Sequence, residues 1–63
     1  MNEEKTWSHS RKGIITGRIV HEWDEFCEIE ATRDLNLEKF NGYSYEVKKG
    51  EKITVRKSFL TEM

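Results

Sequence analysis

Apolar and polar residues alternate along much of this chain, and a period of two is typical of β-strands that bury one face. The alternation predicts strands near residues 13–22, 26–31, 43–47 and 52–57. The first of these is long enough to bend and to serve two sheets. The pattern therefore predicts an all-β fold, and we expect a small SH3-like barrel of about five strands.

The segment at residues 43–56 suggests a definite hairpin register. A three-residue loop ending in glycine would place Tyr45 opposite Ile53 and Tyr43 opposite Val55, with polar pairs on the other side. Both tyrosines then face the core, and the lysines of the segment lie along its edge. This register predicts a lysine-rich rim without exposed aromatic rings.

A second hairpin is predicted from residues 13–22 and 26–31. A three-residue connection would place His21 opposite Ile29 on the inner face. Glycine in a strand interior is typical of bulges and sharp bends, so we expect one at Gly17.

The remaining segments have weaker patterns. Residues 1–10 have no apolar periodicity and are expected to form a flexible N-terminal arm, with a single domain at residues 11–63. A two-residue hairpin loop at Asn41-Gly42 would put the preceding leucines on the wrong face. We therefore expect a short helical turn near residues 34–40, or an irregular loop, in place of a hairpin.

Size and composition narrow the functional classes. At 63 residues, with 35% hydrophobic residues, the core is thin, and a homo-oligomer is one common remedy. The single cysteine, Cys27, alternates inward, and it suits a reducing compartment, so we expect a cytoplasmic protein. The sequence has no signal-peptide pattern and no run of membrane-spanning length, so no membrane association is expected.

Charge is unevenly distributed although the net charge is only −1. Residues 21–30 contain five acids and no lysine or arginine, whereas residues 47–57 contain five bases and one acid. Basic side chains on a strand neutralise phosphates, so we predict binding to RNA or another single-stranded nucleic acid. The candidate contacts are Arg11, Lys12, Arg18, Lys48, Lys49, Lys52, Arg56 and Lys57.

The acidic segment supports a second hypothesis, in which the protein docks on a larger, basic protein as an interaction module or inhibitor. The candidate contacts are Glu22, Asp24, Glu25, Phe26 and Glu28.

Catalysis has little support in the sequence. His21, Asp24 and Glu28 suggest a metal-assisted enzyme only in outline, since their spacing matches no known calcium, zinc or metalloprotease motif. Neither histidine has a nucleophile at a recognisable spacing. We expect no enzymatic activity, no cofactor and no metal site.

Two segments resemble the Sm/Hfq family of RNA-binding proteins. GRIVHEWDEFCEIE at residues 17–30 is similar to the first Sm motif, and VKKGEKITV at residues 47–55 is similar to the second. The resemblance implies a strongly bent small barrel, assembly into rings through strand edges, and RNA contacts near Asp24, Phe26, Lys49 and Gly50. GIITGRIV also resembles the KOW segment of SH3-like domains that contact RNA or the transcription machinery.

Overall fold

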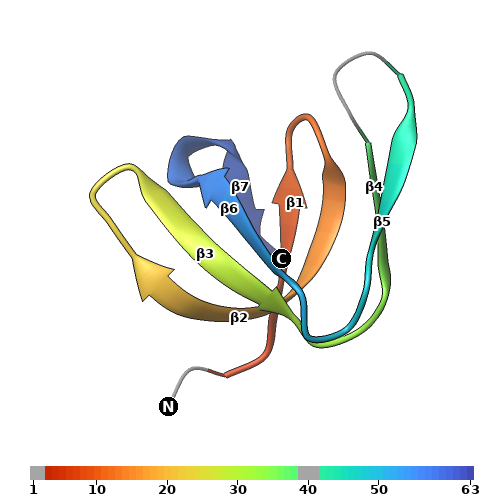
Figure 1. Ribbon diagram of the computed structural model, residues 1–63. Helices are drawn as coiled ribbons and strands as arrows, with labels where there is room; N and C mark the ends of the chain where they lie inside the picture. The colour runs from red at the N-terminus through yellow and green to blue at the C-terminus, as the bar shows by residue number, and fades with distance from the viewer. Residues whose placement is uncertain (1–2, 39–41) are drawn as a thin grey trace.

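The computed structural model describes residues 3–38 and 42–63, and these ranges form strands joined by turns and one 3₁₀ turn (Figure 1). The elements are β1 (Lys5–His9), β2 (Gly13–Glu22), β3 (Phe26–Ala31), β4 (Leu35–Glu38), β5 (Ser44–Val47), β6 (Lys52–Arg56), η1 (Lys57–Phe59) and β7 (Leu60–Glu62). The strands form a five-stranded antiparallel sheet in the order β6-β3-β2-β1-β7 and a two-stranded sheet, β4-β5. The all-β prediction is confirmed.

Strand β2 organises the larger sheet because it pairs with β1 along its first half and with β3 along its second. Gly17 belongs to both ladders, opposite Lys5 on one side and Ala31 on the other. A Cβ at position 17 would lie 2.3 Å from the carbonyl oxygen of Glu30 and 2.8 Å from Cγ2 of Ile29. The absence of a side chain therefore lets β3 approach the curved strand β2 (Figure 1).

The core includes side chains from both sheets. Its fully buried members include Ile15, Cys27, Ile29 and Leu37. The predicted inward orientation of Cys27 is confirmed, at 1% exposure.

The prediction of a flexible N-terminal arm at residues 1–10 is wrong for residues 5–9. Residues 5–9 form β1, which pairs with β2 on one side and β7 on the other. Trp7 is 5% exposed and belongs to the core. One large aromatic ring supplies enough buried area to order a short strand that shows no apolar periodicity.

The predicted hairpin within residues 43–56 is wrong. β5 pairs with β4, and β6 pairs with β3, so that Ile53 lies opposite Ile29. Residues 48–51, which we call the bend, connect β5 to β6. The bend is hydrogen-bonded to the end of β3, because the Gly50 N–H donates to the carbonyl of Ala31 at 2.8 Å. The prediction failed because it paired strands adjacent in sequence, whereas β3 offers β6 a more apolar partner.

Tyr43 and Tyr45 therefore have different environments. Tyr45 lies opposite Leu37 and packs partly against the core, as its predicted inward orientation requires. Tyr43 is 69% exposed, so its predicted inward orientation is wrong.

The helical turn predicted near residues 34–40 is also wrong within the described residues, because Leu35–Glu38 is strand β4. The register pairs Leu35 with Val47 and Leu37 with Tyr45, and it turns both leucines of β4 into the core. The part of this prediction that falls on residues 39 and 40 lies outside the described residues.

A bulge changes the orientation of the end of β2. The register shifts between Ile19 and His21, and the N–H of Trp23 donates to the carbonyl of Phe26 at 2.8 Å, which leaves only two residues at the turn. One extra residue reverses the alternation, so His21 lies opposite Glu28 and is exposed. The predicted inward orientation of His21 and the three-residue connection are both wrong.

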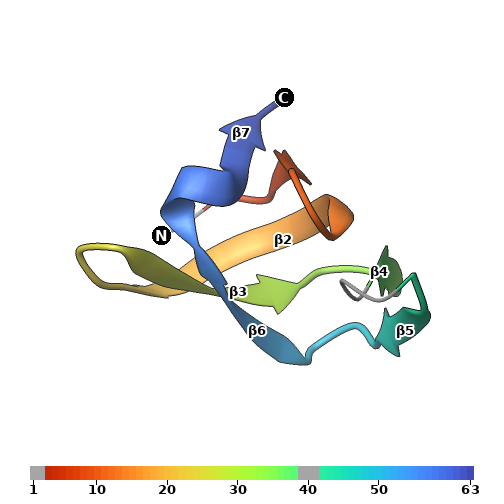
Figure 2. The same ribbon diagram turned by 90° about the horizontal axis from the view of Figure 1, so that it is seen from above.

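The larger sheet remains open within the described ranges. η1 carries the chain from β6 to β7, which pairs with β1, yet the edge strands β6 and β7 do not pair with each other (Figure 2).

Candidate nucleic-acid interface

The basic segment at residues 47–57 contains the edge strand β6, the turn before it and the first residue of η1. Lys52 and Arg56 are exposed with Thr54 between them, while Ile53 and Val55 turn toward the core. This alternation places two cations on the outer face of an edge strand, where lysine and arginine also discourage pairing with another chain.

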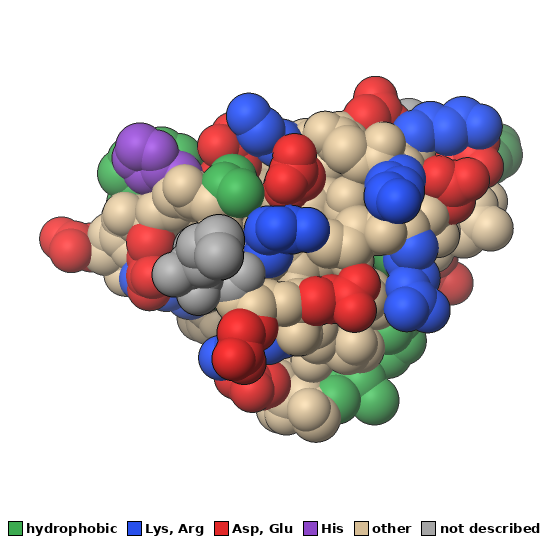
Figure 3. Space-filling model, turned by 90° about the horizontal axis from the view of Figure 1, so that it is seen from below, with side chains coloured by type: hydrophobic (Ala, Val, Ile, Leu, Met, Phe, Trp, Pro, Cys, Tyr) green, Lys and Arg blue, Asp and Glu red, His purple; other side chains and the backbone are tan. Residues whose placement is uncertain are grey.

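The acidic segment lies beside these cations. Within β3, Glu30 lies between Arg18 of β2 and Lys52 of β6, and Glu28 lies between His21 and Thr54. The Nε of Arg18 is 3.9 Å from a carboxylate oxygen of Glu30. Antiparallel pairing thus interleaves charges that are segregated along the sequence, and acidic and basic side chains alternate over the face seen in Figure 3.

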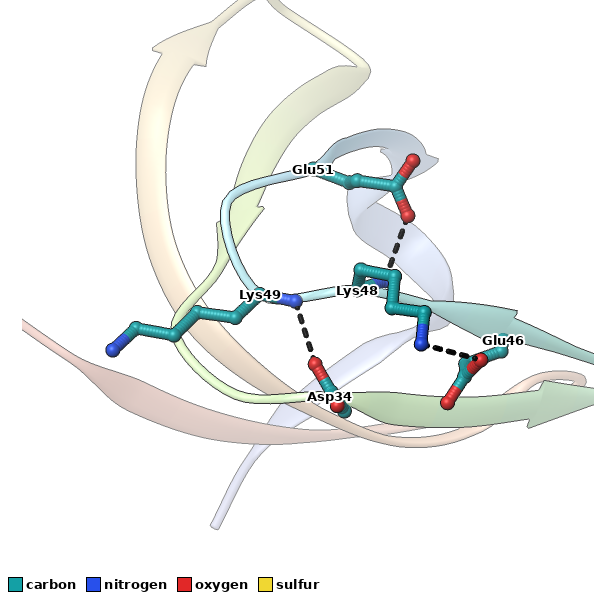
Figure 4. Close-up of polar contacts among 5 residues, drawn as sticks. All are labelled: Asp34, Glu46, Lys48, Lys49 and Glu51. Atoms are coloured by element: carbon teal, nitrogen blue, oxygen red, sulfur yellow. Dashed lines mark hydrogen bonds and ion pairs between the residues drawn. The ribbon is translucent and has the colours of Figure 1, made fainter.

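The bend between β5 and β6 holds its lysines differently (Figure 4). The Nζ of Lys48 is 3.2 Å from a carboxylate oxygen of Glu46, and the hydrogen bond and charge of Glu46 raise the pKa of Lys48. The backbone N–H of Lys48 donates to Glu51 at 2.7 Å, and that of Lys49 donates to Asp34 at 2.9 Å. The side chain of Lys49 extends away from these carboxylates.

Two other predicted contacts, Arg56 and Lys57, lie at the end of β6 away from the bend, and both contact other side chains of the protein. The Nζ of Lys57 is 2.6 Å from a carboxylate oxygen of Glu22. The guanidinium of Arg56 lies over the ring of Phe26, 5.1 Å from its centroid.

Arg11 and Lys12 belong to the turn between β1 and β2 and not to β6. Arg11 lies over the ring of Phe59 at 5.5 Å, and the Nζ of Lys12 donates to the hydroxyl of Tyr45 at 3.1 Å. The backbone N–H groups of both residues donate to Nδ1 of His9, at 3.0 and 3.1 Å.

The predicted acidic contacts differ in their surroundings. Glu22 is paired with Lys57, and Glu28 is half-buried in the middle of the sheet. Asp24, Glu25 and Phe26 remain exposed at the turn between β2 and β3.

Exposed aromatic residues at this turn were missed by the sequence reasoning. The rings of His21 and Trp23 stack with centroids 4.4 Å apart and an angle of 22° between planes, and Trp23 is 46% exposed. The density of aromatic residues at positions 21–26 was a visible signal, but the bulge that turns two of them outward was not.

The four positions implied by the Sm/Hfq resemblance lie at two ends of the β3-β6 ladder. Phe26 lies opposite Arg56 at one end, whereas Gly50 hydrogen-bonds to Ala31 at the other. The fold therefore does not gather these positions into one pocket.

The groups with catalytic potential differ in burial, since Cys27 and His9 are buried whereas His21 is exposed. Burial raises the pKa of the Cys27 thiol, with a further contribution from the charge of Glu22. No group of three or more histidine, cysteine or acidic residues among residues 3–38 and 42–63 could hold a metal ion. The same residues contain no helix of the length and apolarity needed to cross a membrane.

Comparison with known proteins finds no matching family model, no matching curated protein and no matching solved structure.

Proposed function

We propose that this chain is a small non-enzymatic binding protein that contacts single-stranded nucleic acid, such as RNA, through a basic edge. The basic edge consists of Lys49, Lys52 and Arg56. One observation carries the proposal: all three cations are exposed on or beside the edge strand β6, and none has an ion-pair partner in the described ranges.

The spacing along β6 suits a phosphate backbone. Lys52 and Arg56 are four residues apart on one strand, which places their Cα atoms about 13 Å apart at the usual rise per residue. Lys49 lies in the turn that precedes β6, and its side chain extends away from the nearby carboxylates (Figure 4). Arg18, Lys48 and Lys57 can add to this contact, because exposed ion pairs are weak in water and a phosphate can replace the carboxylate.

Three phosphate contacts predict a moderate dependence on salt. Each contact to a single strand contributes about −0.7 to the slope of log K against log salt, so affinity should fall about twentyfold between 50 and 200 mM salt. The interleaved glutamates of β3 argue against a steeper dependence.

The barrel remains part of this proposal. The long curved strand β2 belongs to two ladders, and η1 returns the chain so that β7 pairs with β1. Both features support a partly open, SH3-like small barrel as the fold class, and the Sm/Hfq resemblance is consistent with it.

The experiment is a fluorescence anisotropy titration of labelled twelve-residue oligouridine RNA at 50 and 200 mM salt. Lys49→Glu should weaken binding about fivefold at 50 mM, as expected for reversal of one phosphate contact. The matched control is Lys5→Glu, which makes the same change in net charge on β1, away from the basic edge. No binding at 50 mM, or equal effects of the two substitutions, would overturn the proposal.

A further inference from the structure

Exposed apolar side chains concentrate at the tip of the β2-β3 hairpin, defined here as residues 20–26. Val20 is 39% exposed, Trp23 46% and Phe26 37%. These are three of the six large hydrophobic residues that are exposed in the described ranges. Exposed apolar groups rimmed by polar residues mark interaction sites more often than single scattered ones do.

The fold holds the rings of the tip in fixed positions. His21 stacks against one face of Trp23, and the Arg56 guanidinium lies over Phe26. Both contacts follow from the register, since the bulge turns His21 outward and Phe26 lies directly opposite Arg56. Rings that are already ordered lose less conformational entropy on binding.

A shallow hollow at the tip is lined by Trp23, Asp24, Glu25 and Phe26. The carboxylates of Asp24 and Glu25 make no ion pair or side-chain hydrogen bond within residues 3–38 and 42–63, although Arg56 and Lys57 line a neighbouring hollow with them. Glu22, two residues away, is neutralised by Lys57. The hollow therefore combines two aromatic walls with two carboxylates that are free to pair.

This combination matches a cationic side chain. Indole is the best aromatic partner for a cation, and the gain increases when a carboxylate pairs with the same group. The phosphates of a nucleic acid would instead be repelled by Asp24 and Glu25. The contact between Arg56 and Phe26 is an example of the same chemistry within the chain.

We propose that the tip is a docking site for a basic segment of a protein partner, with an arginine or lysine of that segment seated between Trp23 and Phe26. Charge complementarity identifies the occupant, and the partner's neighbouring apolar residues contact Val20. Tryptophan and arginine are the residues that most often dominate the energy of protein interfaces. The tip adjoins the basic edge at Arg56, which contacts Phe26, but it includes neither Lys49 nor Lys52 and does not depend on nucleic-acid binding.

The test uses the full chain and a twelve-residue peptide of alternating arginine and glycine with blocked ends. Binding is followed at 150 mM salt by ¹⁵N-resolved NMR, with the Trp23 indole N–H as the reporter. The peptide should shift the Trp23 indole and the backbone signals of residues 23–26. Trp23→Ala should weaken binding about tenfold, as for a hot-spot residue.

A matched pair of double variants separates the tip from general attraction between charges. Asp24→Asn with Glu25→Gln should weaken peptide binding about fivefold, as expected when a charged pairing is lost. Glu3→Gln with Glu38→Gln removes the same charge from exposed positions elsewhere and should change affinity less than twofold.

Three results would overturn the inference: Trp23→Ala with unchanged affinity, equal weakening by the two double variants, or oligouridine RNA in place of the peptide shifting the Trp23 indole. The last result would identify the occupant of the tip as nucleic acid. Failure of this inference is distinguishable from failure of the proposed function, which depends on Lys49 and on RNA alone.

Discussion

The two ends of the β3-β6 ladder both contain acidic residues, but these residues have different roles. At the bend and the facing residues 31–34, the carboxylate of Asp34 accepts the backbone N–H of Lys49, and the carboxylate of Glu51 accepts that of Lys48. At the tip, Asp24 and Glu25 have no such partner among the described residues and lie beside exposed rings. The comparison teaches that carboxylates at the bend stabilise the fold, whereas those at the tip are available to a partner.

The largest expected effect on stability is that of a substitution at Gly17, because β3, which belongs to both ends, lies very close to β2 at this residue. Gly17→Ala should lower the free energy of unfolding by about 3 kcal/mol, as for severe overpacking against backbone atoms. Gly50→Ala at the bend is the control, since its φ is +94° but nothing lies within 4 Å of the added Cβ.

That control should cost about 1 kcal/mol, the usual penalty for a left-handed conformation. Urea unfolding measures both variants. If Gly17→Ala were no more destabilising than Gly50→Ala, β3 would not depend on close approach at Gly17.

A second effect tests the bend directly. Asp34→Ala removes the acceptor of the Lys49 N–H and should cost about 1 kcal/mol, whereas Asp34→Asn keeps an oxygen acceptor and should cost less than about 0.5 kcal/mol. Asp24→Ala at the tip should leave stability unchanged within about 0.5 kcal/mol. Equal losses from Asp34→Ala and Asp24→Ala would remove the distinction between the two ends.

A third effect is a pH dependence at the turn between β1 and β2, where His9 binds backbone N–H groups as Asp34 does at the bend. His9 is 5% exposed, and its Nδ1 accepts two N–H groups. Burial, followed by the charges of Lys12 and Arg11, lowers the pKa of His9 below the ordinary value of 6.5.

A lowered pKa means that the unfolded chain binds the proton more readily than the folded protein does. The contribution of His9 to stability is therefore fully present above about pH 6.5 and decreases as the pH falls toward the folded pKa. Urea unfolding at pH 7.5 and 5.5 should show a loss on acidification, and His9→Gln should reduce that loss. An identical pH dependence in His9→Gln would show that other groups cause it.

The smallest expected effect is that of Trp23→Ala on stability. Because the ring is exposed and outside the core, its removal should change the free energy of unfolding by less than about 0.5 kcal/mol. The same variant should weaken peptide binding about tenfold, as stated above. A loss of several kcal/mol would mean that the Trp23 ring supports the fold and is not held ready for a partner.

Local alternation predicted much of the sheet. The bounds of β2 and β3 and the burial of Cys27 follow from a period of two, since each strand has one apolar face. β1 was missed because only Trp7 among its residues is strongly apolar, and its burial depends on partners far along the chain.

The strand partners and the side-chain orientations were harder to predict, because each depends on a single bend or bulge of the backbone. The sequence placed a turn ending at Gly50, but no local pattern shows that the strands on its two sides, β5 and β6, pair with two different strands. The bulge near Val20 reverses the faces of His21 and Trp23, so the aromatic tip was invisible to strict alternation. The separation of acidic and basic segments along the sequence is likewise not kept in the fold, because β3 lies between β2 and β6.

The most direct test of the difference between the two ends is a ¹⁵N-resolved NMR titration of the full chain with twelve-residue oligouridine RNA at 50 mM salt. The account predicts shifts at the amides of Lys49 and Lys52, which disappear at high salt, and no shift of the Trp23 indole. A shift of the Trp23 indole without shifts at Lys49 and Lys52, or no shift anywhere, would contradict it.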